Sequence, residues 1–99
     1  MANFKLTNKA VEDLTKIWDY TNEKWSEKQA DKYYKMLLEN CKFIANDPNI
    51  GKKYKEIRDD LWGLNANRHI IFYRKLNDHS IEITRILHER MDLKNRMNE

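Results

Sequence analysis

The sequence is poor in the residues that break or cross-link a chain. Its 99 residues include two glycines (Gly51 and Gly63), one proline (Pro48) and one cysteine (Cys41). Few glycines and prolines disfavour a many-turned β-sandwich and favour long regular elements. A single cysteine excludes an intramolecular disulfide and fits a reducing compartment.

Long hydrophobic runs are also missing. No segment approaches the roughly 20 apolar residues of a membrane-spanning helix, and residues 1–9 lack the apolar core of a signal peptide. We therefore expect a cytoplasmic protein with no membrane partner. The length and balanced composition predict one domain over residues 1–99, with residues 93–99 as a flexible or helical tail.

Signatures of metal, cofactor or nucleophile chemistry are absent as well. The three histidines and Cys41 do not have the spacing of zinc ligands. There is no glycine-rich phosphate loop, and no serine stands in a recognisable pattern with a histidine and an acid. We predict neither a metal nor a cofactor.

Charge is present but unevenly placed. Residues 1–50 carry eight lysines and eight acids, whereas residues 51–99 carry eleven basic and eight acidic residues and all three histidines. This asymmetry indicates an anionic partner for the second half, or a solvated basic face with no partner.

Hydrophobic periodicity predicts a strand and two helices in the first half. The strand covers residues 3–7. Thr7 is placed to cap the first helix, with Glu12 and Asp13 complementing its dipole. A capping box at Ser26 starts the second helix and Pro48 ends it. The short connection predicts an antiparallel hairpin. Its apolar stripes assign four residues to the core: Trp18, Tyr33, Tyr34 and Cys41.

The second half favours a sheet. We predict a loop over residues 49–60 with a short extended piece at 54–57. A weak strand at 61–67 follows, with Gly63 as a bulge candidate. Residues 69–76 are apolar on both faces, which predicts a central strand. After a turn at 77–80, the last strand runs to His88. The fold class is therefore α+β, with the hairpin on one face of a three-stranded antiparallel meander.

Several segments resemble one family over nearly the whole chain. They are LTNKAVEDLTKIWDYT at 6–21, SEKQADKYYKML at 26–37, DPNIGK at 47–52, RHIIFYR at 68–74 and ILHERMD at 86–92. Together they resemble the ParE branch of the RelE/ParE superfamily of bacterial toxins. The resemblance implies a toxin of a type II toxin–antitoxin system, neutralised by a cognate antitoxin and directed against DNA gyrase. RelE-type relatives instead cut messenger RNA in the ribosome.

A toxin that acts by binding needs a surface and no catalytic residues. The arginines of the second half suit bidentate contacts to carboxylates or phosphates, and large aromatics outside the helical stripes could line a groove. Arg85 and Arg90 could equally form a local ion network with Glu82, Glu89 and Asp92. The predicted partner-binding residues are Trp25, Trp62, Arg68, Arg74, Arg85, His88 and Arg90.

The alternative is a metal-independent endoribonuclease. That reaction needs an acid, a base and cations on the phosphate. His88, Arg68 and Arg85 are the candidates, with His88 as acid or base because of its intrinsic pKa. A strand-end histidine bonded to its neighbours would also explain His88, and we favour binding over catalysis.

Overall fold

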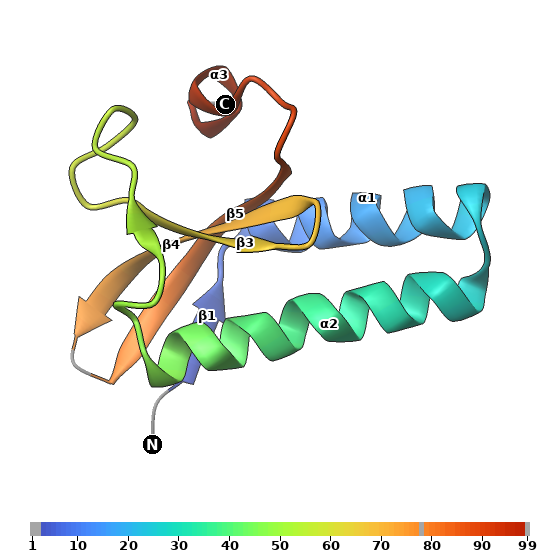
Figure 1. The fold of residues 1–99 in the computed structure, drawn as a ribbon, viewed down its shortest axis with the longest axis horizontal. Coiled ribbons are helices and arrows are strands. Elements are labelled where there is room, and N and C mark those ends of the chain that lie inside the picture. The colour runs from blue at the N-terminus through green and yellow to red at the C-terminus, as the bar shows by residue number, and fades with distance from the viewer. Residues whose placement is uncertain (1–2, 78, 99) are drawn as a thin grey trace.

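The computed structural model describes residues 3–77 and 79–98. Figure 1 shows a helical hairpin that extends past a twisted sheet, with a short C-terminal helix on the other side of that sheet. The elements in chain order are β1 (Asn3–Leu6), α1 (Asn8–Lys24), α2 (Glu27–Asn46), β2 (Lys52–Lys53), β3 (Trp62–Ala66), β4 (His69–Asn77), β5 (Ser80–His88) and α3 (Leu93–Met97). Within residues 3–77 and 79–98, the helices lack the apolar length that spanning a bilayer requires.

The five strands form one sheet in the order β1-β5-β4-β3-β2. The antiparallel β3-β4-β5 meander and the central place of β4 confirm the predicted α+β class. β1 forms one edge of the sheet, a position that the sequence analysis did not predict. It runs parallel to β5, from Asn3 opposite Ser80 to Leu6 opposite Ile83. β2 is the other edge and pairs with β3 through two residues.

Both helices of the hairpin begin at the predicted caps. The Thr7 hydroxyl accepts the Ala10 N–H at 3.1 Å and donates to the Thr84 carbonyl at 2.8 Å, so one side chain starts α1 and ties it to β5. The Ser26 hydroxyl accepts the Gln29 N–H at 3.1 Å. Each such cap typically contributes about 1 kcal/mol.

Apolar side chains fill both faces of the sheet. One cluster lies between the hairpin and the sheet and includes Leu37, Ile44, Ile71, Tyr73 and Ile83. The second cluster lies on the opposite face, beneath the loop that follows β2 and beneath α3. Its buried members are Tyr54, Leu61, Ile70, Phe72, Leu87 and Met97. The C-terminal segment is therefore helical over Leu93–Met97 and packs through Met97.

Two local predictions for the segment before β4 are wrong. The extended piece lies at Lys52–Lys53, whereas Tyr54 begins a turn in which its carbonyl accepts the Ile57 N–H. Gly63 is not a bulge, because β3 pairs with β4 in unbroken register. A Cβ at Gly63 would lie 2.6 Å from the Tyr54 ring, so close packing explains the glycine.

The pairing of β4 with β5 is irregular instead, between Phe72 and Tyr73 and again between Lys75 and Asn77. Phe72 pairs with Arg85 and Tyr73 with Ile83, which leaves Thr84 as an extra residue. A bulge reverses the inward and outward alternation beyond it. The predicted turn at 77–80 is described only in part, since residue 78 lies outside the described residues. Within it the His79 N–H donates to the Asn77 side chain at 2.8 Å.

Candidate partner-binding groove

A groove of about 880 Å³ opens between the hairpin and one end of the sheet. We call it the hairpin groove. α1 supplies one wall, Tyr33 of α2 contributes from the hairpin, and the β3–β4 turn and the end of β5 supply the other wall. Its lining includes Lys16, Ile17, Tyr20, Thr21, Trp25, Tyr33, Asn67, Arg68, His69, Ile86, His88, Arg90 and Met91.

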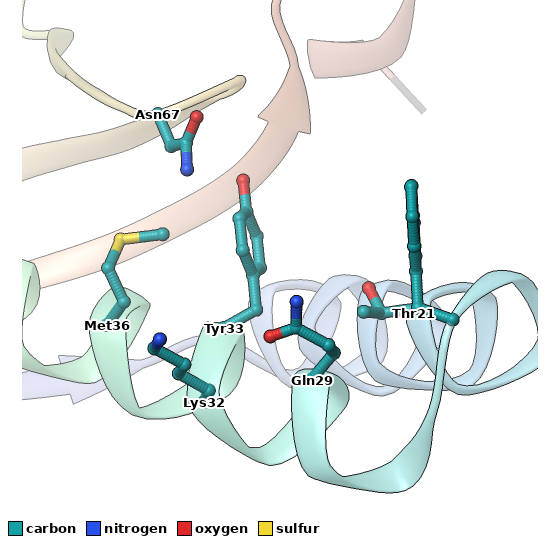
Figure 2. Close-up of a pocket in the computed structure, with 7 residues that line it drawn as sticks. Thr21, Gln29, Lys32, Tyr33, Met36 and Asn67 are labelled. Atoms are coloured by element: carbon teal, nitrogen blue, oxygen red, sulfur yellow. The ribbon is translucent and has the colours of Figure 1, made fainter.

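A smaller hollow of about 330 Å³ continues the groove along α2. It shares Thr21, Trp25, Tyr33 and Asn67 with the hairpin groove. Figure 2 shows the Tyr33 ring standing up from α2 toward the turn that carries Asn67. Asn67 has φ of 62°, a left-handed conformation that asparagine tolerates better than most residues. This conformation makes the β3–β4 turn tight, and the turn forms part of the wall of the hairpin groove.

Three polar rings meet where the hairpin approaches the sheet. The Tyr33 hydroxyl and His69 Nδ1 share a hydrogen bond of 2.6 Å. His69 and His88 are paired across β4 and β5, with ring centroids 5.3 Å apart in an edge-to-face arrangement. His88 Nδ1 accepts the Arg90 N–H at 3.1 Å. These contacts fix both imidazoles and link α2 to the two central strands.

Burial sets the protonation of these groups. Burial and, to a lesser extent, the nearby His88 together lower the pKa of His69 to about 4, and the Asp13 carboxylate opposes part of this shift. Burial also raises the pKa of the Tyr33 hydroxyl, which the Arg68 backbone N–H partly offsets. His69 is therefore a neutral hydrogen-bonding group near pH 7 and a poor general base.

The open side of the hairpin groove combines large apolar side chains with cations. Trp25 is 75% exposed and Tyr20 61% exposed, which is unusual for aromatics of this size. Lys16, Arg68 and Arg90 are exposed around them. Apolar area surrounded by positive charge is typical of a surface that binds an amphipathic, acidic segment.

The structure brings together four of the predicted site residues. Trp25, Arg68, His88 and Arg90 line the hairpin groove. Two others lie elsewhere on the sheet. Arg74 pairs with Glu82 at 2.8 Å on the surface. Trp62 stacks on Tyr73 near the β2 edge, with ring centroids 6.2 Å apart.

Arg85 is buried beside the groove and bonds inward. Its Nε and Nη2 donate to the two Asp13 carboxylate oxygens at 2.7 and 3.0 Å, and its Nη1 donates to the Arg96 carbonyl at 2.7 Å. Asp13 also accepts the Ile86 N–H at 3.0 Å. These bonds of Arg85 link α1 through β5 to α3, whereas the sequence had left open a local network with Glu82, Glu89 and Asp92.

Sequence reasoning missed part of the groove. Tyr33 was assigned to the core, yet it is half-buried and faces His69. Tyr34 was also assigned to the core and is 37% exposed. Asp13 was predicted to complement the dipole of the first helix, yet it is buried and pairs with Arg85. The sequence held a weak signal for His69, because it is the first residue of the most apolar strand.

Metal binding has no assembled donor set in the described part of the chain, since no three His, Cys, Asp or Glu side chains gather there in a way that could hold an ion. Cys41 is buried in the hairpin core, where burial raises the pKa of its thiol to about 12. A thiol in this state is inert as a nucleophile.

The fold and the hairpin groove define a small α+β domain with an open basic and aromatic cleft. Its fold matches a solved structure described as "Chromosomal ParDE TA system from P. aeruginosa", with a TM-score of 0.75 at 23% identity, covering 89% of this chain and 96% of that chain. At this identity the likeness concerns the fold alone.

Sequence comparisons go further. The family model "ParE toxin of type II toxin-antitoxin system, parDE" matches residues 4–93. Toxin ParE1 of Mycobacterium tuberculosis is 35% identical over 93% of this chain and 94% of that protein. Toxin ParE1 of Caulobacter vibrioides is 30% identical over the same shares. The chain belongs to the ParE toxin family of type II toxin–antitoxin systems.

Proposed function

We propose that this ParE toxin inhibits DNA gyrase by protein–protein contact, in the cytoplasm, and that a cognate antitoxin neutralises it by occupying the hairpin groove. The observation that carries the proposal is the groove itself. It is open, its aromatics Tyr20 and Trp25 are largely exposed, and the exposed cations Lys16, Arg68 and Arg90 also line it.

Charge and shape indicate what the groove would take. An amphipathic helix or extended segment could seat apolar side chains against Ile17, Trp25 and Met91. Acidic side chains on the same segment would meet Arg68 and Arg90, which suit bidentate carboxylate binding. A short neighbouring reading frame encoding such a segment would supply the antitoxin.

The state of the ionisable groups favours binding over chemistry. Arg85, a candidate for holding a phosphate in the nuclease alternative, is bonded to Asp13 and the Arg96 carbonyl and is 8% exposed. His69 stays neutral with a pKa of about 4, and His88 Nδ1 is engaged by the Arg90 N–H. His69 is therefore unsuited to act as a general base near neutral pH.

A gyrase supercoiling assay tests the proposal. Purified toxin should inhibit supercoiling of relaxed plasmid, and prior mixing with the antitoxin should restore it. Full gyrase activity at a large molar excess of a folded toxin would contradict the proposal.

Expression of the toxin in cells tests the ribonuclease alternative. Primer extension on cellular messages should find no codon-aligned cuts after toxin induction. Such cuts, if lost on His88→Ala, would replace the proposed target with the ribosome.

A further inference from the structure

A second charged surface lies at the β2 edge of the sheet, the short green arrow in Figure 1, well away from the end of the hairpin. Lys52, Lys53 and Lys75 are exposed there. Lys75 Nζ lies 4.0 Å and Lys53 Nζ 5.5 Å from the Trp62 ring centroid, and Lys52 Nζ lies 4.9 Å from the Tyr54 ring centroid. We call these three residues the lysine edge.

The lysine edge carries charge on both faces of the sheet. Lys53 pairs with Trp62, and Trp62 pairs with Tyr73, two residues before Lys75, so Lys53 and Lys75 share the hairpin face. Lys52 pairs with Gly63, and a Cβ at Gly63 would point toward the Tyr54 ring. Lys52 therefore lies on the face of the sheet opposite the hairpin. The edge therefore carries positive charge on both of its faces.

Each of the three ammonium groups lies near an aromatic ring, and none forms an ion pair with another described residue. Contact with an aromatic ring holds each one, and Lys75 also donates to the Asn49 side-chain oxygen. Among the described residues, the ion pairs involve other cations, namely Lys42, Arg74 and Arg85. A lysine already held against an aromatic ring loses less side-chain entropy on binding an anion than a lysine that moves freely in solvent.

We propose that the lysine edge binds the phosphate backbone of duplex nucleic acid, independently of the hairpin groove. An edge with cations on both faces suits a duplex groove, because the groove presents a row of phosphates on each side. An acidic peptide would meet only one face. Lysines on an edge strand also prevent association with strands of other molecules. That role does not explain why Lys75, which lies in β4, approaches the same Trp62 ring as Lys53.

Fluorescence anisotropy with a labelled 20-base-pair duplex in 50 mM KCl tests the proposal. The wild-type toxin should bind, and Lys53→Glu/Lys75→Glu should lose at least tenfold in affinity. Each phosphate contact contributes about 0.9 to the slope of log K against log salt, so the slope should fall by about 2. Lys52→Glu alone should also weaken binding, because both faces contribute.

The matched control is Lys28→Glu/Lys35→Glu, which makes the same change in net charge on exposed positions of α2. It should retain wild-type affinity. Because Lys75 packs on Trp62, Lys53→Gln/Lys75→Gln is measured too; it removes both charges but keeps polar side chains of similar size, and it should show a smaller loss of affinity. Circular dichroism confirms that each variant is folded.

Three results would overturn the proposal. One is no duplex binding by the wild type at 50 mM KCl. Another is an equal loss in the α2 control, which would mean that net charge alone drives association. The third is tighter, Lys53-dependent binding of a polyglutamate peptide than of duplex, which would assign the edge to an acidic protein. None of these outcomes depends on gyrase inhibition.

Discussion

Asp13 is the residue on which the end of β5 depends. β1 ends at Leu6, opposite Ile83, so β5 has no strand neighbour on that side farther along. The Asp13 carboxylate takes that place, because it accepts the Ile86 N–H and both Arg85 donors. One side chain thus satisfies a strand edge and neutralises a buried cation.

Replacing Asp13 by alanine should therefore destabilise the protein strongly. It leaves the Arg85 guanidinium buried without its carboxylate, which typically costs about 3–5 kcal/mol. Asp13→Leu/Arg85→Met should recover much of that loss, because neither charge remains buried. Urea denaturation measures both variants. A loss below about 1 kcal/mol in the single variant would contradict this role.

His69 gives the protein a distinct pH dependence. Its pKa in the folded state is about 4, below the ordinary value of 6.5, because burial disfavours the charged ring. Between these two values the unfolded chain binds the additional proton, so stability falls as pH falls. The contribution is about 1.4 kcal/mol per pH unit within this window and stops changing below pH 4.

His69→Asn provides the comparison for that slope. Asparagine offers an acceptor to the Tyr33 hydroxyl but does not titrate. The stability of the wild type should fall more steeply than that of the variant between pH 6.5 and 4.5. Parallel slopes, or a His69 pKa near 6.5 in an NMR titration, would refute the predicted burial effect.

Among the elements, β5 shows where sequence patterns reach their limit. Strict alternation from Ile81 and Ile83 would place Arg85 on the hairpin face. The bulge at Thr84 instead aligns Ile86 with that face and Leu87 with the opposite one. Helix starts were predictable because a cap is a local interaction of three or four residues. The bulge and the parallel β1 pairing depend on contacts between distant segments.

β3 provides a test at the same scale. Gly63→Ala places a Cβ 2.6 Å from the Tyr54 ring and 3.1 Å from Ile70, so both neighbours must shift. We expect a loss of about 1–3 kcal/mol from overpacking. Asn65→Ala, an exposed position on the same strand, should change stability by less than about 0.5 kcal/mol. Equal effects in thermal denaturation would refute the packing explanation.

For the molecule as a whole, the hairpin sets the position of the groove. It extends beyond the sheet, so its inner face is covered near β1 and β5 and open toward its end (Figure 1). The sequence indicated Trp25, Arg68, His88 and Arg90 separately. It could not show that they share one groove, because residues 25 and 90 meet only through the hairpin geometry.

The most direct test is the affinity of the purified toxin for gyrase, measured by surface plasmon resonance in the absence of antitoxin. The wild type should bind, and Arg68→Glu/Arg90→Glu should weaken binding at least tenfold by reversing charge around the groove. Lys28→Glu/Lys35→Glu, with the same net charge, should bind as the wild type does. No detectable binding, or equal affinity of all three proteins, would contradict a toxin that acts through this groove.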